Sequence, residues 1–286
     1  MSIVKGMDPI DVEPDPDDLR YWSVTTIIGA LDKPALVHWS AIETAKAAVR
    51  KEKTWREILA TDGEEAAIAY LKNARFQRLV GQRSAAELGT EVHAACEQYA
   101  LSGTRPETDE EVTPFVDQFD RFLQEFQPEY QATEVTVYSP TYGYAGTCDG
   151  FLTIDGQRLI IDYKTSREST DARGKEKGPY PEVALQLAAY RYAELAAVWR
   201  PRRMEQWRRR YYLLSQTERE VGVPVPEVDA GAVIYLTPDR YAVHPVRCDE
   251  AVHQSFLFTL EAARWAFQLS KDVVGGPMMP GREVAA

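Results

Sequence analysis

The sequence predicts an α/β fold in which a mixed central β-sheet is flanked by helices. Apolar residues recur at helical spacing through the first half of the chain, and three strand-like segments follow. A helical segment then separates these strands from a later hairpin pattern. This order of elements is typical of an α/β domain with a mixed sheet.

The chain begins with an acidic, Pro-rich segment and continues as one predicted domain. Residues 1–20 are expected to be a flexible lead-in, because they are acidic and Pro-rich. They also lack the basic and then apolar order of a secretory signal. Residues 21–286 are expected to form a single domain with a helical N-terminal part over 21–130. Within that part, apolar stripes at helical spacing predict core-facing helices at 84–101 and 113–129.

Strands follow these helices. Three are expected in succession, at 133–138, 146–154 and 157–163. The last two flank Asp155-Gly156, a dipeptide favoured in two-residue hairpin turns. The polar residues 169–180, rich in Gly and Lys, predict a mobile loop. Three further elements are expected: a helix at 181–199, a hairpin at 232–246 and a closing helix at 249–271.

Composition excludes several classes of protein. The hydrophobic content of 44% and charged content of 27% are ordinary for a globular protein. No apolar run approaches the ~20 residues needed to span a bilayer, so we expect a cytoplasmic protein without a membrane partner. The net charge of -11 argues against a uniformly basic surface, although a local basic groove and bound cations are compatible with it. Cys96, Cys148 and Cys248 form no CxxC pair and are expected to be buried, reduced thiols.

Two aspartates are predicted to oppose each other across the hairpin. Counting back in equal steps from the Asp155-Gly156 turn places Asp149 opposite Asp162, with their Cβ atoms about 5 Å apart. The same counting places Thr147 opposite Lys164, on the face of Asp162. Like charges this close are destabilising unless they are compensated.

Three arrangements would relieve this repulsion: protonation of one carboxylate, bridging by Lys164, or a divalent cation bound between the acids. Hard oxygen ligands from two strands suit one or two Mg²⁺ or Mn²⁺ ions. Such ions polarise a phosphodiester and activate water, and a lysine beside them offsets growing negative charge. A solvated polar face is the competing interpretation of the acid pair.

Four motifs in order resemble the RecB-type exonuclease branch of the PD-(D/E)XK nuclease superfamily. They are "GTEVH" (89–93), "GTCDG" (146–150), "IIDYKTS" (160–166) and "QLAAYRYA" (186–193). The resemblance implies a restriction-endonuclease-like core, here over about residues 84–246. It also implies that His93, Asp149 and Asp162 ligate metal, with the backbone carbonyl of Tyr163 as an added ligand.

The resemblance further implies that Lys164 is the catalytic lysine and that Gln186 and Tyr190 shape the site. Two other acids are candidates. Glu97 lies one turn after His93, where it would orient the imidazole or be a solvated acid. Glu134 lies on the strand before the hairpin, where some relatives place an acid near the metals.

An iron–sulfur cluster is not expected. Some relatives, the CRISPR-associated exonucleases, bind one through four cysteines, and three scattered cysteines do not supply four thiolates. The chain therefore resembles the cluster-less relatives encoded by bacteriophages, which act in the cytoplasm of a bacterial host. Phage recombination or replication proteins would then be partners.

A basic stretch, "WRPRRMEQWRRR" (199–210), is the strongest candidate for contacting DNA. Arginine binds phosphate and tryptophan stacks on bases. The alternative is a solvated helix end. The expected DNA-contacting residues are Arg202, Arg203, Trp207 and Arg208, with Lys175 in the loop after the D-x-K strand.

These observations predict a metal-dependent DNA exonuclease acting on linear double-stranded ends. The competing hypotheses are a non-catalytic DNA-binding or assembly protein that keeps the nuclease fold, and a metal-dependent phosphoesterase acting on another substrate. Relatives without catalysis typically lose the acid or the lysine, whereas Asp149, Asp162 and Lys164 are all present here.

Overall fold

A computed structural model describes most of the chain. The residues described are 19–32, 34–73, 83–171, 173–198, 202–206, 209–214, 221–271 and 273–275. The chain divides into two compact units, of which the first comprises Asp32–Thr90 and the second Met1–Leu31 with Glu91–Ala286. No described helix has the length and apolar character required to cross a membrane.

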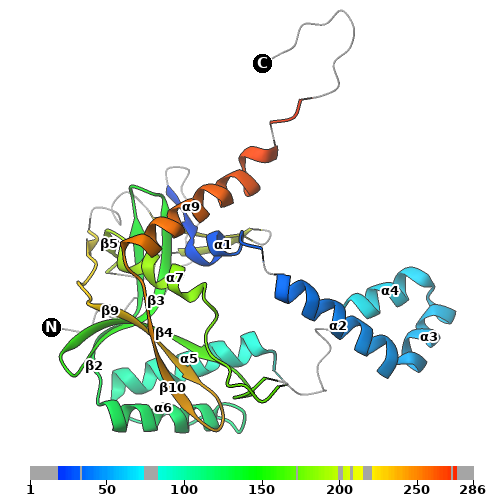
Figure 1. Cartoon of the computed structure of the whole chain (residues 1–286), viewed down its shortest axis with the longest axis horizontal. Coiled ribbons are helices and arrows are strands. Elements are labelled where there is room, and N and C mark those ends of the chain that lie inside the picture. Colours follow the sequence, from blue (N-terminus) through cyan, green and yellow to red (C-terminus); the bar gives the residue numbers. More distant parts are fainter. Residues whose placement is uncertain are drawn as a thin grey trace, which may run out of the picture. The chain divides into compact units, whose positions relative to one another are not determined.

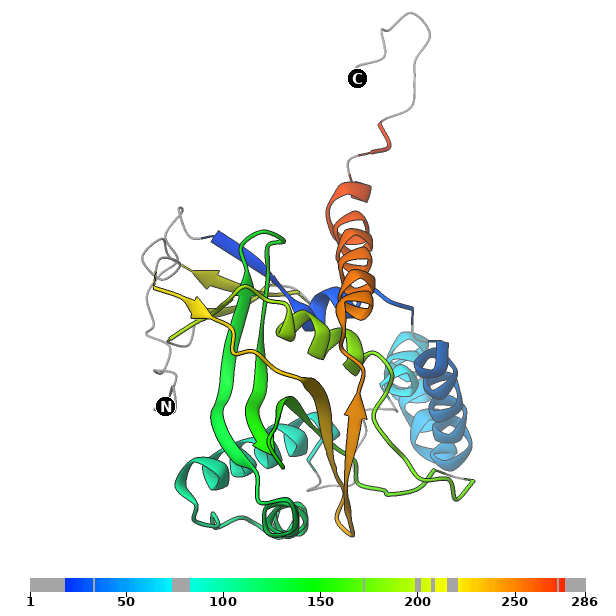
Figure 2. The same ribbon diagram turned by 60° about the vertical axis from the view of Figure 1, so that its left-hand side comes forward.

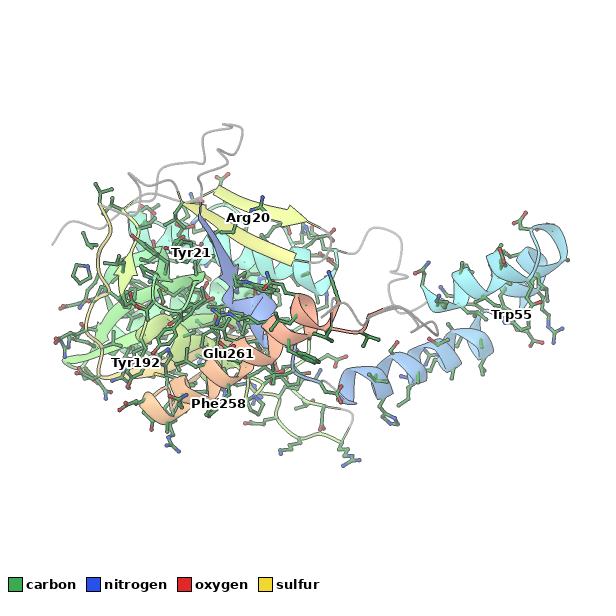
Figure 3. All side chains as sticks on the ribbon, turned by 90° about the horizontal axis from the view of Figure 1, so that it is seen from above. Arg20, Tyr21, Trp55, Tyr192, Phe258 and Glu261 are labelled. Atoms are coloured by element: carbon green, nitrogen blue, oxygen red, sulfur yellow. The ribbon has the colours of Figure 1, made fainter. Side chains whose placement is uncertain are left out.

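The first unit is helical. Its helices are α2 (Pro34–Arg50), α3 (Glu52–Thr61) and α4 (Glu64–Lys72), and α5 (Ala85–Ser102) begins in it and continues into the second unit. The indole Nε1 of Trp55, labelled in Figure 3, donates a hydrogen bond of 3.0 Å to the carbonyl of Ala48 and thereby ties α3 to α2. Ala47 and Ala67 are buried, so small side chains allow these helices to pack closely.

The second unit contains a mixed β-sheet, as the sequence predicts. Most of its strands follow the order β10-β9-β4-β3-β1-β7-β6, and β2 adds to β3. The pairs β4–β9 and β1–β3 are parallel, whereas β2–β3, β3–β4 and β9–β10 are antiparallel. The strands are β1 (Leu19–Ser23), β2 (Glu129–Ser139), β3 (Tyr144–Ile154), β4 (Gln157–Thr165), β5 (Leu195–Ala196), β6 (Arg202–Gln206), β7 (Arg209–Leu214), β8 (Val223–Pro224), β9 (Ala230–Leu236) and β10 (Tyr241–Val246).

Helices cover both faces of this sheet (Figures 1 and 2). On one face lie α5 and α6 (Thr113–Phe126), and the buried ring of Phe119 packs edge-on against Tyr163 of β4. On the other face lie α1 (Val24–Ile28), α7 (Val183–Arg191) and α9 (Glu250–Phe267), which share one hydrophobic cluster with the sheet. Of the four phenylalanines predicted to face the core from α6, Phe115, Phe119 and Phe122 are buried, whereas Phe126 at the end of the helix is exposed.

The predicted hairpin is confirmed. Five residue pairs join β3 to β4, from Ile154–Gln157 next to the turn to Gly150–Ile161. Asp155 and Gly156 have φ angles of 48° and 79°, as a type I′ turn requires at both central positions.

One expectation and one alternative interpretation about local structure are wrong. The helix expected at 181–199 ends at Arg191, and Leu195–Ala196 instead form strand β5 beside β2. The basic stretch, for which a helix end is the alternative interpretation, contains strands β6 and β7, which pair with each other while β7 pairs with β1. In both places, pairing with an existing strand edge overrides local helical character.

Candidate active site at the fork between β3 and β4

The site lies where two paired strands separate. The described β3–β4 ladder ends at Gly150–Ile161, and further along β3 the same edge pairs with β1 at Ala145 and Tyr144. Strand β4 meanwhile stays paired with β9 as far as Thr165. Asp149 and Asp162 are the next residues after the last ladder pair, so they stand at the fork.

Asp149 replaces a backbone carbonyl at the fork. Its Oδ2 accepts a hydrogen bond of 2.5 Å from the backbone N–H of Tyr163, which the ladder no longer pairs. Its Oδ1 lies 3.5 Å from Nδ1 of His93 on α5. Because the Asp149 side chain is only 11% exposed, both contacts are needed to compensate its charge.

Asp162 is held by the opposite layer and by its own strand. Its Oδ1 accepts a hydrogen bond of 2.9 Å from Nε2 of Gln186 on α7. Its Oδ2 lies 2.5 Å from Nζ of Lys164, although the angles do not make this contact a regular hydrogen bond. The Asp162 side chain is 3% exposed, whereas that of Lys164 is 38% exposed and reaches solvent.

The two carboxylates differ in acidity because their surroundings differ. Burial, followed by the charge of Asp149, raises the pKa of Asp162 to about 6. Burial acts on Asp149 in the same direction, but the charge and hydrogen bond of His93 and the N–H of Tyr163 outweigh it and lower its pKa. Burial would lower the pKa of His93, but attraction to Asp149 raises it above its ordinary value. Asp162 is therefore the weaker acid of the two, and the two carboxyl groups and His93 influence one another's protonation.

The donor atoms suit a hard divalent cation. Oδ2 of Asp162 is a buried acceptor without a regular hydrogen bond, which is the condition that an added cation relieves. Among the described residues, however, no three His, Cys, Asp or Glu side chains surround a common point. Without a metal ion, the imidazole of His93 is the ionic partner of Asp149, and its role as a metal ligand stays a prediction.

Gln186 and Tyr190 lie together on α7, as their spacing predicts. Nε2 of Gln186 lies 3.2 Å from the hydroxyl oxygen of Tyr190, to which it also donates a hydrogen bond. On the other face of the sheet, the ring of Tyr163 packs edge-on against His93, and its hydroxyl contacts that of Tyr130 at 2.7 Å. The site is thus supported by α5 from one side and by α7 from the other.

The two additional acids are placed differently. Glu134 lies in β2 between the pairs Thr133–Gly150 and Val135–Cys148, a register that puts it across from Asp149. Its φ angle of 50° is uncommon for a residue other than glycine. Glu97 lies on α5 one turn after His93, but the described contact of the imidazole is with Asp149.

Two predicted pairs, Asp149–Asp162 and Thr147–Lys164, lie beyond the last pair of the described β3–β4 ladder. Thr147 is not opposite Lys164, because β3 and β4 have separated before this point. On the other edge of β3, Thr147 pairs with Thr136 of β2, and its hydroxyl contacts those of Thr136 and Tyr212 at 3.0 and 3.1 Å. The equal-step counting holds only as far as the strands remain paired.

The predicted DNA-contacting residues are described in part. Arg202 and Arg203 belong to β6, whose side chains the structure does not describe, and Trp207 and Arg208 lie outside the described residues. Lys175 is exposed, and its backbone N–H donates to Oδ1 of Asp171 within the loop after β4.

That loop, expected to be mobile, is bound by polar contacts. Lys177 pairs with Glu168 at 2.6 Å, and Arg240 of the β9–β10 turn donates to the carbonyl of Ser169 at 2.8 Å. These contacts attach the loop to the neighbouring hairpin and fix where Lys175 emerges.

The three cysteines are buried free thiols, as predicted. Burial raises the pKa of Cys96 and of Cys148, which lie close to Asp149. Both thiols therefore remain protonated and act as small apolar side chains.

Gly146 is a residue to which sequence reasoning assigned no role. A Cβ atom at this position would lie 2.4 Å from Cε1 of Tyr190. The position of Gly146 in the "GTCDG" motif was the available sign that it has a role. The sequence did not indicate which side chain packs against it.

Comparisons with known proteins add little. No family model matches the chain, and no curated protein matches it. A solved structure described as "Crystal structure of SSO0001" is 15% identical, and the match covers 86% of this chain and 75% of that one with a TM-score of 0.33. A similarity this weak supports no argument about fold or function.

Proposed function

We propose that this chain is a metal-dependent DNA nuclease with a restriction-endonuclease-like core, and that it acts as an exonuclease on linear double-stranded DNA. One observation carries the proposal. The buried carboxylate of Asp162 and the partly buried one of Asp149 stand at the end of a hairpin ladder, with the ammonium group of Lys164 2.5 Å from Asp162. The four motifs quoted above add to this support.

The residues of the chain would divide the work as follows. His93, Asp149, Asp162 and the carbonyl of Tyr163 would hold one or two Mg²⁺ or Mn²⁺ ions, which when bound polarise the phosphate and lower the pKa of water. Gln186 orients Asp162 through its amide, and His93 balances the charge of Asp149. Such outer contacts set the direction in which ligand atoms point.

Lys164 has the freedom that a catalytic cation needs. Its side chain is partly exposed, so its ammonium group can leave Asp162 and approach a phosphate oxygen at the surface. There it would offset the negative charge that grows during hydrolysis. Without substrate, the same group compensates the buried carboxylate of Asp162.

The test uses purified full-length protein with end-labelled linear DNA and closed circular DNA, in Mg²⁺, Mn²⁺ or EDTA. Asp162→Ala and Lys164→Ala are compared with Arg158→Ala. Arg158 lies at the turn end of β4 and pairs with Asp229, which makes it a control remote from the fork. We expect metal-dependent release of nucleotides from linear DNA, lost in the first two variants and retained in the control.

Each other outcome has a definite meaning. Equal degradation of closed circles would remove the exonuclease assignment and leave a nuclease. DNA binding without cleavage by the unmodified chain would favour the non-catalytic protein. Cleavage retained by both site variants, with folding intact by circular dichroism, would refute the assigned residues.

A further inference from the structure

Strand β3 has a gap in its pairing that one aromatic side chain covers. Between the last pair with β4 at Gly150 and the first pair with β1 at Ala145, no described partner strand is paired with this edge. Gly146 lies in this interval. A Cβ atom there would stand 2.4 Å from Cε1 and 3.1 Å from both Cζ and the hydroxyl oxygen of Tyr190.

The Tyr190 ring cannot easily retreat from this contact. It is 2% exposed and belongs to the core cluster formed by α1, α7, α9 and the sheet, beside Leu187 and Ala189 of its own helix. Buried side chains occupy a close-packed interior, so the ring has no adjacent space to enter. Only the missing side chain of Gly146 allows the ring to approach the strand this closely.

Tyr190 in turn determines where the Gln186 amide lies. The same Nε2 atom contacts the Tyr190 hydroxyl at 3.2 Å and Oδ1 of Asp162 at 2.9 Å. An amide NH₂ group has two hydrogens, so one nitrogen can serve both acceptors. A displacement of the ring would therefore move or release the group that orients Asp162.

We propose that Gly146 is a positioning residue: by admitting the Tyr190 ring against β3, it holds the Gln186 amide on Asp162 and so keeps that carboxylate directed at the fork. The proposal rests on the proposed function for its consequence, metal binding. The packing that it describes can be tested without that function.

The packing is tested by urea unfolding of the full chain in EDTA. Gly146→Ala should lower the unfolding midpoint, although alanine in a strand interior is ordinarily better than glycine. Tyr190→Leu removes the ring atoms that an added methyl group would meet, whereas Tyr190→Phe keeps them. In the Leu background, Gly146→Ala should cost little or raise the midpoint, and in the Phe background it should cost as much as in the unmodified chain. Equal costs in both backgrounds would overturn the packing claim.

The connection to Asp162 is tested by Mn²⁺ titration calorimetry without DNA. Gly146→Ala should weaken Mn²⁺ binding by about 10-fold or more, the range seen when an outer contact of a metal ligand is lost. Gln186→Met removes the amide but adds no methyl group at position 146. It should weaken Mn²⁺ binding comparably, and it keeps the test valid if Gly146→Ala folds poorly. Gly275→Ala is the control, because a Cβ atom there would meet nothing within 4 Å.

The results separate the two proposals. Failure of the unmodified chain to bind Mn²⁺ or cleave DNA would refute the proposed function, while the unfolding data would still decide the packing. Tight Mn²⁺ binding by the unmodified chain that is unchanged in both Gly146→Ala and Gln186→Met would refute the positioning role alone.

Discussion

Replacing Asp162 with asparagine should stabilise the metal-free protein at neutral pH. Burial raises the pKa of this carboxyl group to about 6, so its ionisation lowers the stability of the folded state. Asparagine has nearly the same shape and is neutral at every pH. Its side-chain oxygen can still accept the hydrogen bond from Gln186.

The magnitude follows from the two pKa values. The ordinary value is 3.8 and the folded value about 6. Below pH 3.8 the carboxyl group is protonated in both states and costs nothing. Between pH 3.8 and 6 only the unfolded state releases the proton, so the free energy of unfolding falls as pH rises and then levels. A shift of about two pH units corresponds to about 3 kcal/mol, which Asp162→Asn should recover above pH 6.

The assay is urea unfolding in EDTA between pH 4.5 and 8. The advantage of Asp162→Asn should grow with pH and reach a plateau, whereas Asp229→Asn should lower the stability by an amount that stays constant across this range. The contact with Arg158 lowers the pKa of Asp229 to about 2, so its charge favours the folded state above pH 3.8. An Asp162→Asn protein that is less stable at pH 8, or a difference independent of pH, would refute the reasoning.

Metal should reverse the order of stability. Ligand binding to the folded state alone adds about 4.1 kcal/mol at 1,000 times its dissociation constant, which exceeds the advantage of about 3 kcal/mol expected for Asp162→Asn. The unmodified protein should therefore gain this much from Mn²⁺, while Asp162→Asn should gain far less. Equal gains would show that the ion binds elsewhere.

Three further predictions follow from the described contacts. Lys164→Gln should lower the hydrolysis rate by about 10²–10³-fold in a single-turnover assay, with Mn²⁺ affinity in calorimetry changed much less; an unchanged rate would remove its catalytic role. Phe119→Ala removes the ring that packs against Tyr163 and should lower the free energy of unfolding, measured in urea, by about 3–5 kcal/mol. A loss below about 1 kcal/mol would contradict the core assignment. Cys96 and Cys148 should react with a thiol reagent only after denaturation, because both are fully buried, and labelling of the native protein would contradict this.

The hairpin shows how far local sequence determines structure. A turn that needs two positive φ angles selects Asp155-Gly156, and a period of two then sets every pair as far as Gly150–Ile161. For the same reason the sequence predicted that Asp149, Asp162 and Lys164 belong to one small region. Helical spacing likewise predicted that Phe119 faces the core and that Gln186 and Tyr190 share a face of one helix.

Only the tertiary structure decided what these side chains meet. Where β3 separates from β4, β3 pairs with β1 instead, while β9 holds the opposite edge of β4, and both are contacts between residues far apart in the chain. The separation leaves the N–H of Tyr163 to the Asp149 side chain, and it leaves Thr147 and Lys164 outside the ladder. The role of Gly146 was equally hidden, because a glycine does not indicate which distant ring will lie against it. Local patterns fix backbone periodicity, whereas long-range packing fixes which periodic faces come together, and the chemistry of the site depends on both.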